Sequence, residues 1–321
     1  MKLAYLIPAG GREIESACAG IAGLEVVCVP ALSDLASMAG DIDALVTGAT
    51  SYTADVAAAL RSDAKKLRWI HFASAGYESV FQHGVPAGVQ VTNSGPAWAP
   101  IVAEHAMALM LALVRHIPDA ERARQTEAWI RPQLMKVLGS LEGLRLVSLG
   151  FGNIGRETAR RAQGFGMKIS GVARTSREEP LAESVVGVSE LYAVLPQADV
   201  LLIATPLNSK TKDLIGAAEL ALLKPSAILI NIARGGIVSE PALIEALSLN
   251  KLAGAGLDVA DTEPLPAGHP FWTLKNVVIT PHIAGFGSSL GLRTMADIVR
   301  ENAQRLTDGR PLVHLVDLSA K

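Results

Sequence analysis

Residues Leu144–Gly155 read L-R-L-V-S-L-G-F-G-N-I-G, and this stretch decides the fold. Its first six residues are mostly apolar and strand-like, Gly150, Gly152 and Gly155 form a G-x-G-x-x-G pattern, and helix-forming residues continue over Asn153–Gln163. In a strand–turn–helix unit such glycines provide a tight turn, close approach of the backbone to a pyrophosphate, and close packing of helix on strand. The free N–H groups that open the helix attract an anion. We therefore expect a dinucleotide site; the alternative is a glycine-rich turn that merely ends a strand. The residues expected to hold the dinucleotide are Gly150, Gly152, Asn153, Ile154 and Gly155.

The bulk properties of the chain limit what it can be. Its 321 residues are long for one domain, so we expect two, and 50% hydrophobic and 19% charged residues are typical of a globular protein with an ample core. A net charge of -2 gives no general attraction for nucleic acid or an anionic membrane. The longest apolar run, Ala106–Val114, is about half the span that a bilayer requires.

The N-terminus and the cysteines bear on localisation. The opening residues, M-K-L-A-Y-L-I-P, have too short an apolar core for a signal peptide and are typical of a first strand. The two cysteines, Cys18 and Cys28, do not have the spacing of a metal site. We therefore expect a reducing cytoplasmic location and no metal.

Residues 1–95 alternate short apolar runs with helical patterns, which predicts a parallel sheet wrapped by helices. The predicted strands are Leu3–Ile7, Val26–Val29, Ala44–Val46 and Trp69–Phe72, and the predicted helices are Glu13–Ile21, Asp34–Met38 and Ala54–Leu60. The loop Pro8–Gly11 lacks the full glycine pattern, so we expect only a strand-to-helix connection there. A break at Asn93–Pro96, with Pro100 soon after, suits a connection between domains.

The second half repeats the pattern, now with the glycine fingerprint. A long apolar helix, Ile101–Arg115, and a charged helix, Asp119–Trp129, precede it; we expect His105, which lies among apolar neighbours without an obvious partner, to be structural. The further predicted strands are Met167–Val172, Val200–Ala204, Ala227–Asn231, Ala253–Leu257 and Val277–Thr280, and the further helices are Ser189–Leu195, Ala217–Leu222, Glu240–Leu249 and Ser288–Leu306.

These patterns predict an α/β protein with two Rossmann-like, doubly wound parallel-sheet domains and an active-site cleft between them. If the last helix packs back on the first domain, the chain crosses between the domains twice. The predicted domains are a discontinuous substrate-binding (catalytic) domain, residues 1–95 and 286–321, and a dinucleotide-binding domain, residues 96–285.

The residues after the second strand of the nucleotide unit bear on the cofactor. An acidic residue about 20 positions past the glycines usually binds the ribose 2′-hydroxyl of NAD. Here that distance falls on Arg174, followed by Thr175 and Ser176, and no acidic residue occurs before Glu178. An arginine with neighbouring hydroxyls suits a 2′-phosphate. The sequence therefore favours NADP(H) over NAD; the alternative is a solvated, charged loop, which accounts equally well for Arg177.

Three polar residues follow strands of the same unit, and the ends of parallel strands face the ligand crevice. Arg234 lies in N-I-A-R-G-G, Glu263 in D-V-A-D-T-E-P-L-P and His282 in T-P-H-I-A-G. Reduction of a 2-keto acid requires a cation for the carboxylate, a polarised carbonyl and a proton for the new alkoxide. Arg234 can serve the first two, His282 can donate the proton, and Glu263 can orient the imidazole and favour its charged form. Taken singly, Arg234 is as readily explained as a turn residue, Glu263 as a loop charge and His282 as a strand-end histidine. Together, and in the same unit as the glycine fingerprint, they indicate a reductase.

The chain resembles the D-isomer-specific 2-hydroxyacid dehydrogenases over nearly its full length. The motifs that carry the resemblance are L-G-F-G-N-I-G, N-I-A-R-G-G-I-V, G-L-D-V-A-D-T-E-P-L-P and I-T-P-H-I-A-G. It implies a catalytic set of Arg234, Glu263 and His282, in which Glu263 pairs with His282. It also implies further ligands: Asp258 and the backbone near Ile232 for the nicotinamide carboxamide, Thr205 and Pro206 along the cofactor cleft, and the amides of Ala75 and Gly76 for the substrate carboxylate. The alternatives are a strand-end cap for Asp258 and a simple turn for Gly76.

Departures from the family pattern refine the expectation. Arg174 in place of an acidic residue resembles the NADPH-dependent glyoxylate/hydroxypyruvate reductase branch. Trp98 lies where relatives commonly have a smaller polar residue, which leaves substrate size open. Trp129 lies where some reductases of this branch send a tryptophan into the active site of a partner subunit; an ordinary packing role is the alternative.

The sequence thus predicts hydride transfer from NADPH, with NAD as a second cofactor, to the carbonyl of a small 2-keto acid such as glyoxylate or hydroxypyruvate, giving the D-2-hydroxy acid. By analogy the enzyme is a homodimer formed through the helices of residues 101–130. The competing hypothesis is a non-enzymatic NAD(P)H-sensing regulatory protein on the same fold, for which a proton donor would have no use.

Overall fold

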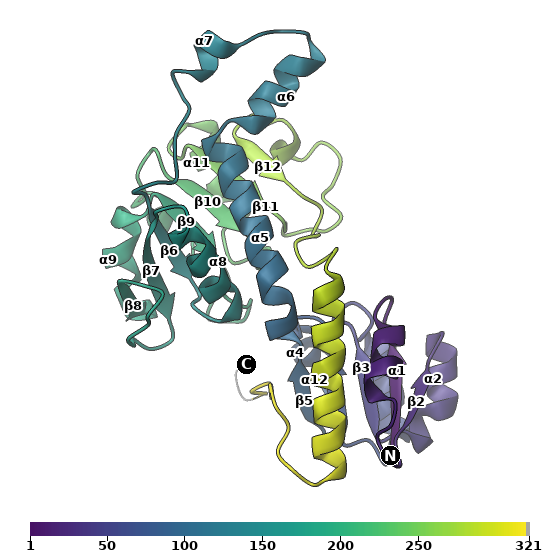
Figure 1. Ribbon diagram of the computed structural model, residues 1–321. Helices are drawn as coiled ribbons and strands as arrows, with labels where there is room; N and C mark the ends of the chain where they lie inside the picture. The colour runs from purple at the N-terminus through teal and green to yellow at the C-terminus, as the bar shows by residue number, and fades with distance from the viewer. Residues whose placement is uncertain (319–321) are drawn as a thin grey trace. The chain divides into compact units, whose positions relative to one another are not determined.

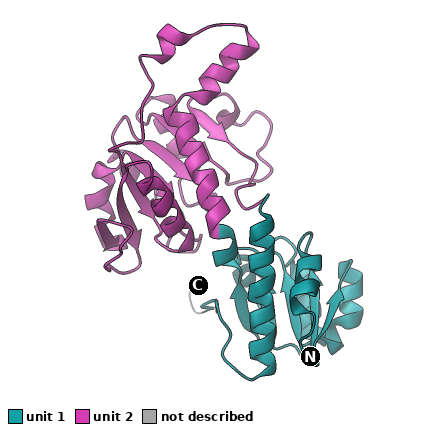
Figure 2. Cartoon of the chain, viewed as in Figure 1, with its two compact units in different colours: residues 1–98, 287–321 teal, residues 99–286 magenta. Residues whose placement is uncertain are grey.

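The computed structural model describes residues 1–318 and divides the chain into two compact units (Figure 2). Unit 1 comprises Met1–Trp98 and Gly287–Lys321, and unit 2 comprises Ala99–Phe286. Each unit has one all-parallel sheet flanked by helices, so the predicted α/β class with two doubly wound sheets is confirmed. Buried strands such as β9, Val-Leu-Leu-Ile, are apolar throughout, and β3 is apolar except for its last residue, Thr47, because helices cover both faces of each sheet.

The sheet of unit 1 has five strands in the order β2-β1-β3-β4-β5, the order of flavodoxin-like folds. The strands are β1 (Lys2–Leu6), β2 (Glu25–Cys28), β3 (Ala44–Thr47), β4 (Trp69–Phe72) and β5 (Gln90–Asn93). The helices are α1 (Gly11–Cys18), α2 (Leu32–Met38), α3 (Ala54–Asp63), α4 (Ser79–His83) and α12 (Ser289–Thr307). Helix α12 packs against α1, as predicted for the last helix (Figure 1). Strand β5 was not predicted, since it is a short edge strand with polar residues at both ends.

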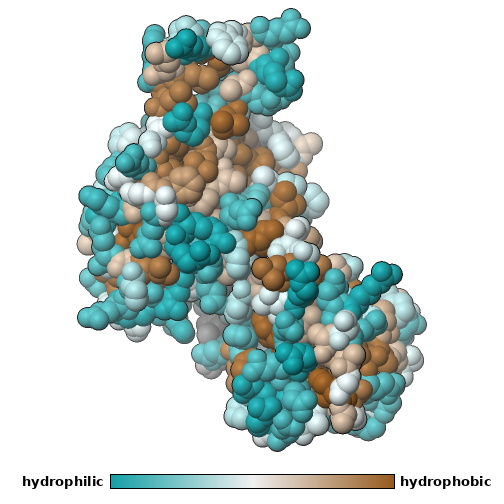
Figure 3. Space-filling model, viewed as in Figure 1, coloured by the Kyte–Doolittle hydropathy of each residue, from teal (hydrophilic) through white to brown (hydrophobic). Residues whose placement is uncertain are grey.

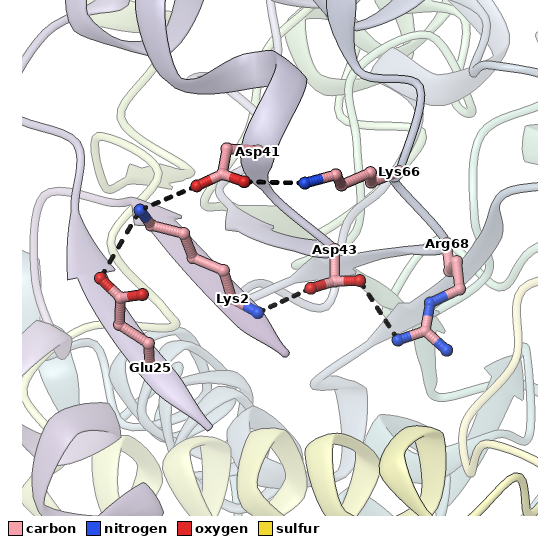
Figure 4. A network of polar contacts seen from close by, with 6 residues as sticks. All are labelled: Lys2, Glu25, Asp41, Asp43, Lys66 and Arg68. Carbon is pink, nitrogen blue, oxygen red and sulfur yellow. Dashed lines mark hydrogen bonds and ion pairs between the residues drawn. The ribbon is translucent and has the colours of Figure 1, made fainter. Parts of the chain in front are cut away.

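A network of ion pairs and hydrogen bonds lies along the edge of this sheet where the strands begin (Figure 4). Lys2 Nζ pairs with Glu25 and Asp41, and Asp41 also pairs with Lys66. The carboxylate of Asp43 accepts the backbone N–H of Lys2 at 2.7 Å and pairs with Arg68 at 3.3 Å. The network joins the starts of neighbouring strands, at the edge opposite to the loops that follow β1 and β4.

The sheet of unit 2 has seven strands in the order β12-β11-β10-β9-β6-β7-β8. Counted from β6, this is the Rossmann order with one extra strand, and its topological switch point lies between β6 and β9. The strands are β6 (Arg145–Leu149), β7 (Lys168–Ala173), β8 (Ser184–Gly187), β9 (Val200–Ile203), β10 (Ile228–Asn231), β11 (Gly254–Leu257) and β12 (Val277–Ile279). The main helices are α5 (Gly95–Val114), α6 (Ile117–Gln125), α7 (Arg131–Leu134), α8 (Asn153–Gln163), α9 (Leu191–Val194), α10 (Ala217–Leu220) and α11 (Glu240–Ser248). The four-residue edge strand β8 was not predicted.

The bounds of two predicted connecting helices were wrong. Helix α5 begins at Gly95 and not at Ile101, so Pro96 lies in its first turn, where the missing N–H of a proline costs nothing. The division between the two units, at Trp98 and Ala99, lies just after the break predicted at Asn93–Pro96. Helix α6 begins at Ile117 and ends at Gln125, so Trp129 lies outside it; Glu127, with φ 53°, follows its end.

Helix α5 is long and apolar enough, by length and composition alone, to cross a membrane, with a mean hydropathy of 1.6. The apolar core helix of a soluble protein passes the same test. In unit 2 the side chains of Leu109 and Leu113 lie against Gly256 and Gly254 of β11, so this part of α5 covers the sheet. That packing accounts for the apolar residues in this part of the helix.

Candidate active site

The glycine fingerprint forms the turn between β6 and α8, as predicted. Gly150 has φ 98°, and a Cβ there would lie 2.4 Å from the carbonyl oxygen of Ala204. A Cβ at Gly155 would lie 2.3 Å from the carbonyl oxygen of Gly150, so the helix packs directly on the turn. Gly152 is different, because a Cβ there would meet nothing within 4 Å. The turn therefore has open space beside Gly152, and α8 begins at the next residue with its free N–H groups.

Side chains hold this turn from two directions. Ser148 Oγ donates to the carbonyl oxygen of Gly150 at 2.8 Å, and Arg177 Nη2 donates to that of Phe151 at 2.6 Å. Arg177, which the sequence left as an ordinary charged loop residue, therefore braces the fingerprint. The N–H of Gly150 donates to the carbonyl oxygen of Val172 at 2.9 Å, whereas those of Phe151 and Gly152 donate to no group within residues 1–318 and are available to a ligand.

The segment after β7 is exposed and carries the predicted cation. Arg174 and Thr175 are exposed, and within residues 1–318 Arg174 has no ion-pair partner. Ser176 is partly committed: its Oγ accepts the N–H of Gly187 at 3.0 Å and lies 3.3 Å from Glu190 Oε1. The guanidinium of Arg174 is thus available for an anion, whereas the hydroxyl of Ser176 is engaged within the protein.

Two further predicted cofactor positions follow the central strands. Thr205 and Pro206 follow β9; Thr205 is half-buried, and the carbonyl oxygen of Pro206 accepts Thr211 Oγ1 at 2.7 Å. Ile232 directly follows β10 and its side chain is buried. The carboxyl ends of β6, β7, β9 and β10 meet at one edge of the sheet, so these residues share that edge.

The loop of Arg234 is joined to the loop that follows β11. Asn231 Nδ2 donates to the carbonyl oxygen of Arg234 at 3.0 Å, and Arg234 Nη1 donates to that of Ala233 at 2.6 Å. Gly235 packs so closely on the neighbouring loop that a Cβ would lie 2.1 Å from the carbonyl oxygen of Ala260. Gly236 N donates to Asp261 Oδ1 at 2.6 Å. Arg234 is therefore held beside the segment that carries Glu263.

Glu263 and His282 form the predicted pair. His282 Nδ1 lies 2.7 Å from Glu263 Oε2, and Glu263 Oε1 accepts the N–H of Ala260 at 3.1 Å. Both side chains are partly exposed, and His282 Nε2 has no hydrogen-bond partner in the described part of the chain. The carboxylate thus engages one imidazole nitrogen and leaves the other for a ligand.

Asp258 anchors the segment around His282. Its side chain is 1% exposed, and it accepts the N–H groups of Ile283 and Ala284, each at 2.9 Å, and the hydroxyl of Thr280 at 2.6 Å. The N–H of His282 donates to the backbone oxygen of Asp258 at 2.8 Å. These bonds hold His282 at its left-handed φ of 53°. The strand-end cap, one of the two roles considered for Asp258, is therefore present, and the nicotinamide role stays a prediction.

His105 has partners that the sequence did not reveal. Its Nε2 lies 2.9 Å from Thr280 Oγ1 and 3.5 Å from Asp258 Oδ1, so the expectation of no partner was wrong. These partners lie about 150 and 175 residues further along the chain, too far for any local pattern to show. The one signal was a polar residue in the middle of an apolar helix.

The predicted carboxylate-binding residues lie in unit 1, in the loop after β4. The carbonyl oxygen of Ala75 accepts Asn93 Nδ2 at 3.1 Å, and that of Gly76 accepts Ser74 Oγ at 2.7 Å. The N–H groups of Ala75 and Gly76 donate to no group within residues 1–318. Two adjacent, unsatisfied amides of this kind suit a carboxylate.

The comparisons with known proteins agree with this geometry. A family model described as "D-isomer specific 2-hydroxyacid dehydrogenase, NAD binding domain" matches residues 107–284. The glyoxylate reductase of Thermococcus gammatolerans is 36% identical over 84% of this chain and 81% of its own length. The structure of a D-isomer specific 2-hydroxyacid dehydrogenase family protein from Aeromonas salmonicida has a TM-score of 0.86 at 30% identity and covers 98% of both chains. The NADPH-dependent glyoxylate/hydroxypyruvate reductase of Sinorhizobium meliloti, in complex with NADP and sulfate, has a TM-score of 0.85 at 27% identity over 99% of both chains.

A Rossmann sheet with an open glycine turn, together with a histidine–carboxylate pair at the same sheet edge, defines a nicotinamide-dependent α/β oxidoreductase. The family model covers more than half of the chain, and the curated relative spans most of it. The chain belongs to the D-isomer-specific 2-hydroxyacid dehydrogenase family.

Proposed function

We propose that the protein is an NADPH-dependent reductase of small 2-keto acids, such as glyoxylate or hydroxypyruvate, that yields the D-2-hydroxy acid. The observation that carries the proposal is the imidazole of His282, held through Nδ1 by Glu263 with Nε2 unpartnered in residues 1–318, in the same unit as the glycine turn. The names of the glyoxylate reductases that the chain resembles support the substrate class.

Each catalytic residue has a role that its contacts support. Arg234 would bind the substrate carboxylate and carbonyl oxygen through its planar fork. A nicotinamide bound at the glycine turn would supply the hydride that the carbonyl carbon requires. His282 Nε2 would give its proton to the carbonyl oxygen as the alkoxide forms, which leaves a neutral imidazole and a hydroxy acid. Glu263, whose second oxygen is anchored by Ala260, would hold the imidazole in orientation and favour its charged form.

The cofactor proposal rests on Arg174, which is exposed after β7 and has no ion-pair partner within residues 1–318. Its guanidinium would bind the 2′-phosphate of NADPH, with the hydroxyl of Thr175 nearby. The solved Sinorhizobium meliloti relative was crystallised with NADP, which agrees with this preference. NADH is expected to bind more weakly but still to serve, because the pyrophosphate site does not depend on this arginine.

Arg174→Ala tests the cofactor proposal. The loss of one charge-assisted contact corresponds to about 1.5–3 kcal/mol, so the Michaelis constant for NADPH should rise at least tenfold while that for NADH changes little. Arg177→Ala is the matched control, since Arg177 donates to the Phe151 carbonyl. Arg177→Ala should raise the Michaelis constants for NADPH and NADH by similar factors. Equal effects of Arg174→Ala on the two cofactors would remove the phosphate role.

The α6–α7 segment supports a homodimer. Trp129 is 89% exposed and Met135 66% exposed, so Trp129 is not a packing residue within its own chain, and that alternative was wrong. Together with Leu134 and Leu138 they line a hollow of about 610 Å³, and Figure 3 shows apolar residues exposed along this part of unit 2. Apolar surface of this kind is typical of a subunit interface. We propose a cytoplasmic homodimer, which light scattering of the purified protein would test.

The central experiment is a panel of 2-keto acids assayed with NADPH and NADH. The proposal expects turnover of glyoxylate or hydroxypyruvate, D stereochemistry where a stereocentre forms, and a loss of kcat of about 10²–10⁴-fold in His282→Ala. The variant should still bind NADPH, as measured by fluorescence titration. A wild-type protein that binds cofactor but turns over no keto acid would overturn the proposal and favour the regulatory alternative.

A further inference from the structure

Every backbone carbonyl in the loop 73–76 of unit 1 is engaged. The carbonyl oxygen of Ala73 accepts the indole N–H of Trp98 at 2.6 Å, and that of Ser74 accepts the N–H of Ser94 at 3.3 Å. The carbonyl oxygens of Ala75 and Gly76 accept Asn93 Nδ2 and Ser74 Oγ, as described above. By contrast, the N–H groups of residues 74, 75 and 76 donate to nothing within residues 1–318.

The two observations are linked by the geometry of the peptide bond. A trans peptide is planar, and its C=O and N–H point in opposite directions. The bond from Trp98 to the Ala73 carbonyl therefore sets the direction of the Ser74 N–H. In the same way Asn93, through the Ala75 carbonyl, sets the direction of the Gly76 N–H. The side chains that hold the carbonyls thus aim the free amides.

Trp98 is itself held in place by α12. A Cβ at Gly291, in the first turn of α12, would lie 2.9 Å from Cζ3 and 3.0 Å from Cε3 of the indole, so the ring occupies the space that a side chain there would need. Ser288 Oγ accepts the N–H of Gly291 at 2.8 Å and fixes that turn. The ring therefore lies between α12 and the Ala73 carbonyl, and both neighbours belong to unit 1.

We propose that Trp98 is a positioning residue for substrate binding: through the Ala73 carbonyl it orients the N–H of Ser74, the first of the three free amides of residues 74–76, toward the carboxylate of the 2-keto acid. This inference rests on the proposed function for the class of substrate. The sequence had left open how Trp98 affects substrate size. Its indole N–H is used within the protein, on a carbonyl that the substrate would not touch.

Trp98→Phe tests the inference, because it keeps an aromatic ring against Gly291 and removes only the donor. The carbonyl oxygen of Ala73 then loses its hydrogen bond from the indole, and the peptide between residues 73 and 74 is no longer fixed. KM for glyoxylate should rise about tenfold, the scale of one hydrogen bond, while kcat stays within about twofold of wild type. The dissociation constant of oxalate, an unreactive dicarboxylate, should rise by the same factor in calorimetry with NADP bound. The affinity for NADPH should not change.

Gly291→Ala provides an independent test, since it displaces the ring without altering the loop or the indole. It should raise the same KM, and the double variant Trp98→Phe/Gly291→Ala should be far from additive, because both act through one contact. The control is Tyr52→Phe, which removes a ring donor from another backbone carbonyl of unit 1, that of Gly84, at 2.7 Å. It should lower the melting temperature and leave KM and oxalate binding unchanged.

The outcomes separate this inference from the proposed function. If wild type reduces glyoxylate and Trp98→Phe matches it in KM and oxalate affinity, the inference is overturned and the proposed function stands. If Tyr52→Phe raises KM as much as Trp98→Phe, the effect is one of general stability and the inference also fails. If wild type neither turns over a keto acid nor binds oxalate, both proposals fall together.

Discussion

The first loop of each sheet makes a similar turn, but the two turns have different neighbours. Gly10, after β1, has φ 95°, and Gly150, after β6, has φ 98°. In unit 1 a Cβ at Gly10 would lie 2.6 Å from Cε of Met295, a residue of α12, so the unit covers its own turn. In unit 2 the space beside Gly152 is open over 4 Å. The glycine with positive φ is thus closely packed in both turns, on a side chain of α12 in unit 1 and on the backbone after β9 in unit 2, and unit 2 has in addition open space beside Gly152.

A glycine turn with positive φ does not by itself make a nucleotide site. The segment after β2 in unit 1 reads V-P-A-L and carries no cation, whereas the matching segment after β7 in unit 2 carries Arg174. An anion site requires free N–H groups, open space and a compensating charge, and the second turn has all three. In unit 1 the side chains of Met295 and Leu292, from α12, lie against the turn instead.

The largest expected effect comes from adding a methyl group to each turn. Gly150→Ala should lower the free energy of unfolding by more than about 3 kcal/mol, since the new Cβ would lie 2.4 Å from a backbone oxygen of β9's loop that cannot move away. Gly10→Ala should cost only about 1–2 kcal/mol, the strain of a left-handed residue, because its obstacle is the end of a flexible methionine. Urea unfolding of both variants measures the difference. Equal losses would show that the two turns are packed alike.

The second prediction concerns the loss of stability of unit 1 at low pH. His71 in β4 is fully buried, with Nδ1 2.7 Å from Thr92 Oγ1 and Nε2 2.7 Å from Ser94 Oγ; unit 2 has the apolar Ile230 at the matching place in β10. Burial, and secondarily the charge of His314, lowers the pKa of His71 to about 3. In the unfolded chain the imidazole of His71 is protonated below about pH 6.5, whereas in the folded chain it stays neutral down to about pH 3. The contribution of His71 to the free energy of unfolding is therefore full above about pH 6.5 and is lost as the pH falls from about 6.5 to about 3.

Over that window His71 should contribute a loss of about 1.4 kcal/mol per pH unit. Hydrogen exchange should show β4 and β5 opening before β10 as the pH is lowered from 7 to 5. His71→Asn is the control: it should be less stable at pH 7, yet its stability should depend less on pH in this window. If that variant keeps the full acid sensitivity of wild type, another group is responsible.

Much of the fold could be predicted because buried parallel strands are apolar and lie between glycine-rich turns. The short edge strands β5 and β8 were missed because polar or small residues dilute that signal. The ends of β10, β11 and β12 could be predicted to bring Arg234, Glu263 and His282 to one edge, since parallel strands end together. The partners of His105 and Trp98 could not, because contacts between residues so distant in the chain leave no local pattern.

The third prediction concerns the open space beside Gly152 in unit 2. Gly152→Val should fold with little loss of stability, because a Cβ there meets no protein atom within 4 Å. It should weaken NADPH binding about 10–100-fold, since extra methyl groups would then occupy the proposed path of the pyrophosphate. Titration of NADPH fluorescence measures this, beside a melting curve. A variant that folds and binds NADPH like wild type would move the pyrophosphate away from this turn.

The smallest effect is expected where the two units are alike. In unit 1 the carboxylate of Asp43 accepts the N–H of Lys2 at 2.7 Å and pairs with Arg68 (Figure 4). In unit 2 the carboxylate of Asp199 accepts the N–H of Arg145 at 2.8 Å and pairs with Lys224. Each aspartate thus ties the start of the central strand to its neighbour, at the edge away from any ligand. Asp43→Asn and Asp199→Asn keep an acceptor and lose the charge, so each should cost about 1 kcal/mol in urea unfolding and leave NADPH affinity unchanged. If Asp199→Asn changes the affinity for NADPH and Asp43→Asn does not, contacts where the strands of unit 2 begin influence the cofactor site where those strands end, and the prediction is wrong.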